Sequence, residues 1–419
     1  MMILQQTRGA LSSGDQCSLD LPFAETKSLA ARIGPTPIFT RASSATFIGS
    51  DGLIQTAATN APRFDHDPLT LACKGLLIEE SRTNSITGSN AFNTWTMSSS
   101  TVAASSVSTP EGTADAWKVV EDSLLANHTA ARAFSPVSGT TYTASVWLKS
   151  AENGFSLIGI TGGGFPTTFI SANLSTGAVS TALGTPIRAA SVAYSNGWWR
   201  VSFSLVATSA LSSNIDIRLS RDGLWANRSY LGNGVNGMYC YGAQVEAGAF
   251  ATSYIPTTTG TAVRSADVCS ITGADFSGFY NQAEGAFSCV STKLSTNLNS
   301  FIVHASDGTF NNAIDMRYNT ATQACSIMNV SNVTQFSLVS TISESALVKQ
   351  SVGYKINDCA YSANSSSVIT DTLAEIPATN RMVIGNAAAS GSYYLNGTVS
   401  SIRYYKKRLP NAKLQALTK

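Results

Sequence analysis

The sequence predicts a mainly β protein, in which two tandem antiparallel β-sandwich (jelly-roll) domains follow an extended N-terminal segment that contains several prolines. Three observations predict this class. Short runs with period two, rich in Val, Ile, Thr and aromatic residues, recur along the chain between clusters of Gly, Ser and Asn. Helical periodicity is nearly absent. The polar residues are mostly Ser, Thr and Asn, since only 12% of the 419 residues are charged, against ~25% in an average soluble domain.

The N-terminal segment, residues 1–87, differs from the rest of the chain. Pro35, Pro37, Pro62 and Pro68 are spaced through short β-like pieces such as PIFTR and GLIQT. Too little contiguous apolar sequence lies here to form an independent core. We therefore expect an extended segment that takes its stability from a partner or from its own trimer axis.

The first predicted domain covers residues 88–260 and the second covers residues 275–419, with a boundary where Pro, Gly and Thr interrupt the pattern at 254–268. About eight strands in a domain of this size suit one jelly-roll. In the first domain we expect strands at 114–122, 129–137, 142–150, 155–161, 167–174, 199–207, 215–220 and 237–246. In the second we expect them at 285–294, 301–306, 313–319, 324–331, 335–341, 351–358, 380–387 and 397–409, followed by a short helical turn in PNAKLQALTK.

Charge and hydropathy exclude several classes of partner. The 27 basic and 25 acidic residues nearly balance, so neither nucleic-acid binding nor a polybasic membrane patch is indicated. No apolar run approaches the ~18 residues of a membrane span. The start, MMILQQTRGALSSGDQ, lacks the apolar region of a signal peptide. We expect a protein that stays where it is made or leaves within a particle.

The seven cysteines stand singly, without a C-x-x-C pair. Their odd number and wide spacing argue against a disulfide framework and against a zinc site. We expect buried, reduced thiols, of which Cys240 between two tyrosines in a predicted strand is an example.

No residue is predicted to be catalytic, and the chain is not expected to be an enzyme. His66, His128 and His304 lie in three different segments without a G-x-S-x-G motif, and we expect each to be a surface or satisfied core residue. A pair of carboxylates across a groove could hydrolyse glycosides. The sequence offers six candidate carboxylates, but any β-sandwich of this size contains as many. The candidates are Asp115, Glu121, Asp122, Asp216, Asp222 and Glu246.

A cofactor is not expected, although a structural Ca²⁺ is left open. Loops of β-sandwiches can hold Ca²⁺ with Asp side chains and carbonyl oxygens. Residues 304–309 (HASDGT) and 220–229 (SRDGLWANRS) are the candidate loops. An ordinary Asp-Gly turn is the favoured explanation of both loops.

Two tryptophans are candidates for binding a sugar. In YTASVWLKS (142–150), strict alternation places Trp147 opposite the apolar set and therefore on the wet face or in a groove. Trp225 lies in a predicted loop together with polar side chains. In sugar-binding sites, the face of an aromatic residue stacks on the sugar ring, and polar side chains form hydrogen bonds with the hydroxyls. The alternative for Trp147 is burial against a loop or a neighbouring subunit. The predicted glycan-binding residues are Trp147, Trp225, Asp222, Asn227, Arg228 and Tyr230.

Residues 39–84 resemble a module common in the virion proteins of tailed bacteriophages. The ordered pattern is R-x-S-x-A-T, then G-L-I, then P-R-F-D, then G-L-L-I-E-x-x-R-T-N, running from Arg41 to Asn84. Residues 196–205 (NGWWRVSFSL), followed by residues 237–257, resemble the end of a jelly-roll of the carbohydrate-binding-module type. Residues 397–418 resemble the last strand of a concanavalin-like or laminin-G-like sandwich.

The resemblance implies a phage virion protein assembled in the host cytoplasm. Such proteins are tail fibres or receptor-binding adhesins, commonly homotrimers, that bind host surface polysaccharide. A capsid-attached fibre or decoration protein and a polysaccharide depolymerase are the alternatives. Residues 1–87 would attach the chain to other virion proteins, and arginines beside carboxylates here could form bidentate ion pairs or remain solvated. The residues assigned to virion anchoring are Arg41, Arg63, Asp65, Glu79 and Arg82.

Overall fold

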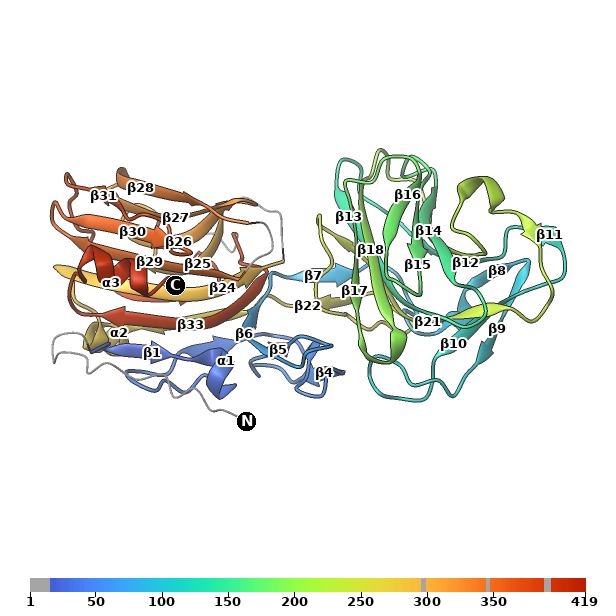
Figure 1. Ribbon diagram of the computed structural model, residues 1–419, viewed down its shortest axis with the longest axis horizontal. Helices are drawn as coiled ribbons and strands as arrows, with labels where there is room; N and C mark the ends of the chain where they lie inside the picture. Colours follow the sequence, from blue (N-terminus) through green and yellow to red (C-terminus); the bar gives the residue numbers. More distant parts are fainter. Residues whose placement is uncertain (1–15, 295–298, 344–346, 388–392) are drawn as a thin grey trace. The chain divides into compact units, whose positions relative to one another are not determined.

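The computed structural model describes residues 16–294, 299–343, 347–387 and 393–419 (Figure 1). Strands make up 49% of the structure and helices 7%. The prediction of a mainly β protein with antiparallel sandwich domains is therefore confirmed. The first fifteen residues, in which we expected no export signal, lie outside the described residues.

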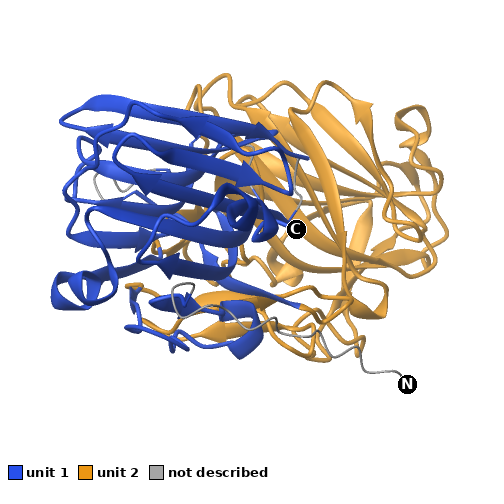
Figure 2. Cartoon of the chain, turned by 60° about the vertical axis from the view of Figure 1, so that its left-hand side comes forward, with its two compact units in different colours: residues 1–40, 73–80, 267–419 blue, residues 41–72, 81–266 orange. Residues whose placement is uncertain are grey.

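The chain forms two compact units (Figure 2). Unit 1 contains residues 1–40, 73–80 and 267–419, and unit 2 contains residues 41–72 and 81–266. This division differs from the three consecutive parts that we expected, 1–87, 88–260 and 275–419. The N-terminal segment is shared between the two units because its short strands pair with strands of both.

One sheet of unit 1 contains the N-terminal strands β1 (Leu19–Leu21) and β6 (Cys73–Ile78), and both of them pair with β33 in the antiparallel sense. Among the strands of unit 1, the order in this sheet is β31 (Ile369–Asp371), β30 (Cys359–Ala363), β29 (Val348–Lys355), β24 (Glu284–Lys293), β33 (Gly397–Tyr405) and β6. The N-terminal residues thus take their stability from strands of the same chain.

The second sheet of unit 1 has an N-terminal strand at its edge. The strand order is β2 (Ile38–Thr40), β23 (Val268–Thr272), β32 (Arg381–Ile384), β25 (Ser300–Ser306), β26 (Ala313–Thr320), β27 (Gln323–Val330) and β28 (Val333–Thr341). The two sheets meet through Tyr318 of β26, whose hydroxyl lies 3.0 Å from the hydroxyl of Ser291 in β24. Phe287, Met316 and Val352 are fully buried there.

Helices are short in both units. Unit 1 has α1 (Phe23–Thr26), α2 (Gly273–Phe279) and α3 (Asn411–Ala416), and unit 2 has the 3-10 turns η1 (Phe92–Thr94), η2 (Ser195–Gly197) and η3 (Trp225–Asn227). α3 confirms the helical turn expected at the end of the sequence. Within the described residues, no helix has the length and apolar character needed to cross a membrane.

Unit 2 is a sandwich of two larger sheets. The first has the order β17 (Arg188–Ala193), β18 (Trp199–Val206), β13 (Thr141–Ser150), β21 (Gly237–Ala247), β10 (Trp117–Glu121) and β9 (Ser100–Ala104). The second has the order β16 (Val179–Leu183), β15 (Thr168–Asn173), β14 (Phe155–Gly162), β19 (Ser213–Ser220), β12 (Thr129–Phe134) and β8 (Thr96–Ser98). Alternate residues of β13, including Val146 and Leu148, lie in the core between the sheets with Ile158 and Ile217.

Smaller strand pairs complete unit 2. They are β3 (Ala45–Ile48) with β4 (Ile54–Ala57), β7 (Arg82–Asn84) with β22 (Ala262–Arg264), and β11 (Leu125–Ala126) with β20 (Tyr230–Leu231). The strand β5 (Phe64–His66) follows the β3–β4 hairpin, and its Asp65 carboxylate accepts the Ile48 amide proton at 2.8 Å. The hairpin is therefore bound to its own unit through main-chain and carboxylate hydrogen bonds.

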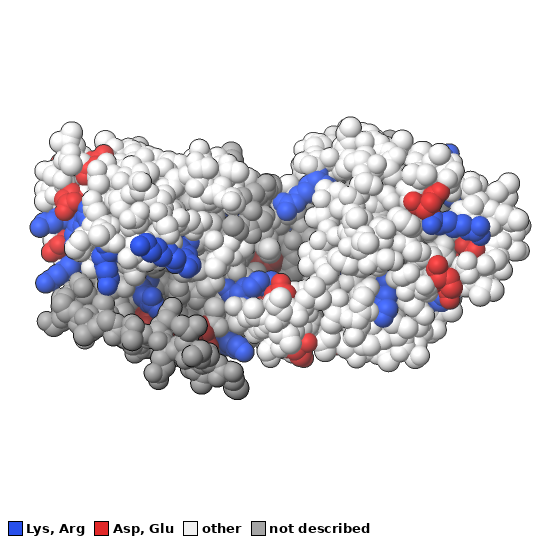
Figure 3. Space-filling view, in the orientation of Figure 1, with Lys and Arg blue, Asp and Glu red and all other residues white. Residues whose placement is uncertain are grey.

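All seven cysteines are free thiols, and five of them are buried. Cys240 has no exposed surface, as expected from its strand, and burial raises the pKa of its thiol. Cys17 and Cys73 are partly exposed. Charged side chains are scattered over the face drawn in Figure 3, and most of that face is uncharged.

Candidate functional site

Trp147 is buried, with 1% of its surface exposed, so the prediction that it is open to a ligand is wrong. The alternation in β13 correctly predicted the side of the sheet on which Trp147 lies, since the indole points away from the main core. On that side it belongs to a second cluster with Tyr194, Trp198 and Tyr254. The alternative of burial against loops of the same chain is what the structure shows.

Segments far apart in the sequence cover Trp147. Ile48 and Ile54 of the β3–β4 hairpin belong to the same cluster, and Tyr254 makes an edge contact with the indole at 5.4 Å between ring centroids. The Arg200 guanidinium lies over the Trp147 ring at 4.4 Å and is held by the Thr252 carbonyl oxygen at 2.7 Å. Trp147 therefore joins the hairpin to the sandwich.

Trp225 remains partly exposed and lies outside both apolar clusters of unit 2. It begins the η3 turn in the loop between β19 and β20. Gly223 lets this loop approach the sheet, since a Cβ there would lie 2.3 Å from the Ser171 hydroxyl and 2.8 Å from the Phe155 ring. The φ of Gly223 is +76°, in the left-handed region that glycine adopts without steric cost.

Polar side chains of the same loop hold its shape. The Asp222 carboxylate accepts the Leu224 amide proton at 2.9 Å and the Asn227 side-chain amide at 2.5 Å. The Arg228 guanidinium lies over the Trp225 ring at 4.5 Å and donates to the Trp225 carbonyl oxygen at 3.1 Å. Asp222 and Asn227 are exposed. Trp225, Asp222, Asn227 and Arg228 are thus brought together, as the sequence predicted.

The loop rests on the outer face of the second sheet. Phe169 of β15 lies 4.8 Å from the Trp225 ring, and the Arg218 guanidinium of β19 lies 4.3 Å from Phe169 and 5.3 Å from Trp225. Phe169 lies over Gly159, where a Cβ would be 2.5 Å from its ring. The aromatic pair is therefore supported by a regular sheet rather than by the loop alone.

Asp216 fixes the guanidinium of Arg218. Two hydrogen bonds, of 2.9 and 3.2 Å, join these side chains, which are 7% and 12% exposed. Burial raises the pKa of the Asp216 carboxyl above its ordinary value, and the Arg218 hydrogen bonds oppose that shift. We call Phe169, Asp216, Arg218, Asp222, Trp225, Asn227 and Arg228 the Trp225 site.

The sequence reasoning missed Phe169 and Arg218. The alternation of β15 and β19 held the signal, because both residues have the parity opposite to their core neighbours Ile170 and Ile217. What the sequence did not indicate is that two strands separated by about forty positions place these residues beside one loop.

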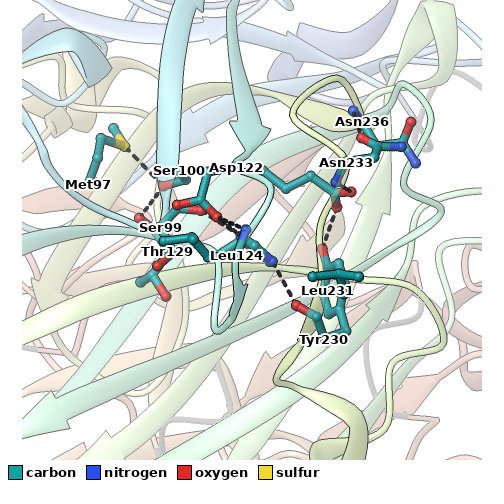
Figure 4. Close-up of polar contacts among 12 residues, drawn as sticks. Met97, Ser99, Ser100, Asp122, Leu124, Thr129, Tyr230, Leu231, Asn233 and Asn236 are labelled. Carbon is teal, nitrogen blue, oxygen red and sulfur yellow. Dashed lines mark hydrogen bonds and ion pairs between the residues drawn. The ribbon is translucent and has the colours of Figure 1, made fainter.

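Tyr230 does not belong to the Trp225 site, so its predicted role in glycan binding is not supported by its position. Its hydroxyl donates to the buried Glu121 carboxylate at 2.7 Å, and the Arg221 guanidinium lies over its ring at 4.5 Å. Burial raises the pKa of Tyr230. Figure 4 shows it in a polar cluster with Ser99, Asp122 and Asn233.

The five residues assigned to virion anchoring are all buried: Arg41, Arg63, Asp65, Glu79 and Arg82. The Arg41 guanidinium donates to the carbonyl oxygens of Ser43 and Ala58, both at 2.8 Å. The Arg63 guanidinium donates to the Thr46 carbonyl oxygen and the Ser253 hydroxyl, both at 2.9 Å. Arg41 and Arg63 therefore hold the chain's own loops, and attachment to other virion proteins stays a prediction.

The carboxylates considered for glycosidase chemistry are largely engaged. Glu246 is fully buried and accepts two hydrogen bonds from Thr252, at 2.9 and 2.6 Å. Glu121 is 1% exposed and Asp216 is paired with Arg218. His66, His128 and His304 are all buried, at 3% exposure or less.

Neither candidate Ca²⁺ loop contains a cluster of metal ligands. The described residues include no group of three or more His, Cys, Asp or Glu side chains placed to hold a metal ion. The Asp307 carboxylate accepts from the amide and the hydroxyl of Thr309 and from Asn312, as in an ordinary turn. Ca²⁺ binding stays a prediction.

A scan against models of protein families finds no match for the chain, and neither does a search of curated proteins. Solved structures similar to it include the CBM40 of the Ruminococcus gnavus IT-sialidase bound to alpha2,6 sialyllactose, at 13% identity over 33% of this chain and 85% of that one, with a TM-score of 0.30. Domains LG4-5 of the mouse laminin alpha1 chain are similar at 9% identity over 83% of this chain and 94% of that one, with a TM-score of 0.26. Similarities of this size carry no functional inference.

Proposed function

We propose that the chain is a non-catalytic bacteriophage virion protein, a tail fibre or receptor-binding adhesin that binds host surface glycan at the Trp225 site. The observation that carries the binding role is the partly exposed Trp225, held outside the apolar clusters by Phe169, Arg218 and Arg228. An aromatic residue that is supported on a sheet but reaches solvent suits stacking on the apolar face of a sugar ring.

The polar groups of the loop suit sugar hydroxyls. Asp222 and Asn227 are exposed and are oriented by each other, so binding would require little further ordering of these side chains. The guanidinium of Arg228 adds donors beside the ring. The site thus offers one stacking surface and several donors and acceptors within one loop.

The absence of catalysis is part of the proposal. It is supported by the internal hydrogen bonds of Glu121 and Glu246, which leave these carboxylates buried in the fold. No cofactor is proposed for binding of this kind.

The virion role is supported by the resemblance of residues 39–84 to a module of phage virion proteins. Since Arg41 and Arg63 of that module hold the chain's own loops, attachment to other virion proteins would use other parts of the surface. A homotrimer assembled in the host cytoplasm is the form we propose. Phage particles purified on a density gradient should contain the chain, as detected with an antibody raised against it; its absence from infectious particles would overturn the virion role.

A glycan array tests the binding role directly. The full chain and the Trp225→Ala variant would be applied to arrays of bacterial polysaccharides, with Leu224→Ala as the matched control. Leu224 is in the same loop and is 57% exposed but has no aromatic face. Loss of stacking should weaken binding by about tenfold or more, taking as a guide the ~1–3 kcal/mol that stacking of a nucleic-acid base on an aromatic residue contributes, while Leu224→Ala should bind normally.

Other outcomes identify the alternatives. A folded chain that binds none of the polysaccharides would favour a decoration protein that makes only protein contacts. Release of oligosaccharides during incubation, followed by chromatography, would favour a depolymerase and overturn the non-catalytic reading.

A further inference from the structure

His128 lies beneath the strand that follows the Trp225 loop, and both of its ring nitrogens face oxygen atoms. Nδ1 is 2.5 Å from the Ser99 carbonyl oxygen and 3.4 Å from the Asp122 carboxylate. Nε2 is 3.1 Å from the carbonyl oxygen of Tyr230 in β20. In Figure 4, Ser99 and Asp122 lie on one side of this cluster and Tyr230 lies on the other.

This geometry suits only one protonation state of the ring. A carbonyl oxygen accepts hydrogen bonds and cannot donate them. A neutral imidazole has one nitrogen without a proton, whose lone pair would face an oxygen lone pair at one of the two carbonyls. The imidazolium has a proton on each nitrogen and donates to both. The side chain is fully buried, so water does not substitute for a lost hydrogen bond.

The charged and titratable groups around the His128 ring either favour the imidazolium or form their own contacts with other residues. Asp122, in the turn after β10, supplies a carboxylate beside Nδ1 and also accepts the Leu124 amide proton at 3.0 Å. The Tyr230 ring lies 4.7 Å from the imidazole and its hydroxyl is donated to Glu121. Arg221 is the nearby cation, and its guanidinium lies on Tyr230 and donates to the Leu231 carbonyl oxygen at 2.8 Å.

The strand that His128 holds is attached to the candidate binding loop. β20 begins at Tyr230, two residues after Arg228, and among the described strands it pairs with the two-residue strand β11 alone. Glu121 holds the next turn by accepting the Asn233 amide proton at 3.0 Å. A Cβ on Gly232 would lie 2.9 Å from the His128 ring, so the chain passes directly over it.

We propose that His128 is a positioning residue which, as an imidazolium, ties β20 to Ser99 and so holds the Trp225 loop in its binding position, and that the loop loosens when this proton is lost. The effect of His128 on glycan binding rests on the proposed function. The mechanical part of the proposal, the loosening of residues 221–236, does not.

Hydrogen exchange on the full chain tests the mechanical part. Protection factors, which remove the intrinsic pH dependence of exchange, would be measured at about pH 5 and about pH 9, on either side of the range in which histidine ordinarily titrates. Residues 221–236 should lose about tenfold in protection at the higher pH, since a charged hydrogen bond is lost from a short strand. β21 serves as the internal control and should not change.

The His128→Gln variant separates charge from packing. Glutamine can still donate to one carbonyl but cannot gain a charge, so its loop should be loose at both pH values. If this variant does not fold, ¹⁵N resonances of the His128 ring in the unmodified chain give the second measurement. Both nitrogens should carry protons wherever the loop is protected. A neutral ring in the protected state, or pH-independent protection, would overturn the proposal.

Glycan affinity distinguishes this proposal from the proposed function. Affinity for a polysaccharide found on the array should fall by about tenfold from about pH 5 to about pH 9 in the unmodified chain and should be flat in His128→Gln. A pH-dependent loop without any glycan binding would contradict the proposed function and leave the role of His128 intact. Binding that is equally tight at both pH values would contradict the role of His128.

Discussion

Trp147 shows what alternation along a strand predicts and what it does not. The period of two in residues 142–150 correctly placed this side chain on the face opposite Val146 and Leu148. It could not show that a hairpin nearly a hundred positions earlier covers that face. An aromatic residue on the outer side of a sheet is therefore as consistent with a second core as with a ligand.

Truncating Trp147 should destabilise unit 2. Trp147→Ala removes a fully buried indole that contacts Tyr194, Tyr254 and Arg200, and such changes cost ~3–5 kcal/mol. Urea denaturation followed by circular dichroism measures the loss. Leu224→Ala, at an exposed position, should change stability by less than ~0.5 kcal/mol. Equal stability of the two variants would contradict the second core.

The sequence predicted about half of the Trp225 site. Asp222, Trp225, Asn227 and Arg228 are close together in the sequence, so one loop was enough to indicate them. Phe169 and Arg218 come from two strands whose registers with β14 place them side by side. Register between strands is set by tertiary packing, which a single sequence does not reveal.

At the scale of elements, long runs with strong alternation were predicted best. β13, β21, β24 and β33 lie where we expected strands. The strands β16, β17, β30 and β31 were not predicted. β16 and β17 are mostly half-exposed Ser, Ala and Thr, so they lack an apolar side that alternation could reveal.

The pairing of β6 with β33 depends on a glycine. Gly75 has φ +107°, and a Cβ there would lie 2.1 Å from the Val399 carbonyl oxygen, which is main chain and cannot move aside. A left-handed backbone alone costs a non-glycine residue ~1–2 kcal/mol. Because the clash adds to this cost, Gly75→Ala should lower the free energy of unfolding of unit 1 by well over that amount.

A matched variant isolates the steric part of that cost. Gly139 has φ +78° with nothing within 4 Å of its added Cβ, so Gly139→Ala should show the backbone cost alone. Thermal unfolding of both variants would be compared by calorimetry. A smaller effect for Gly75→Ala than for Gly139→Ala would show that the β6–β33 contact can relax.

At the scale of the whole molecule, the order of segments decides which fragments can fold. The chain passes between the units after residues 40, 72, 80 and 266. Unit 1 therefore needs β1, β2 and β6 from the N-terminal part, and unit 2 needs the β3–β4 hairpin. Neither unit corresponds to a continuous stretch of sequence.

A fragment that begins after the N-terminal segment should fold poorly. Residues 88–419 lack Ile48 and Ile54, which cover Trp147, and lack β1 and β6, which pair with β33. We expect this fragment to bind a hydrophobic dye and to be digested rapidly by protease, because apolar surface is left uncovered. Residues 16–419, which keep every described strand, are the control and should resist both. A fragment 88–419 as resistant as the control would contradict this dependence.

The pairing of β1 with β33 also sets the timing of folding during synthesis. β1 ends at Leu21 and β33 begins at Gly397, so at ~5–20 residues per second the ribosome needs about 20 to 75 s to supply the partner of a strand already made. Until then Leu19 and Leu21, which are fully buried in the finished protein, have no sheet to join. A chain whose synthesis stops before β33 is thereby left with an open sheet that chaperones and proteases recognise, and only chains that include β33 can pair it with β1.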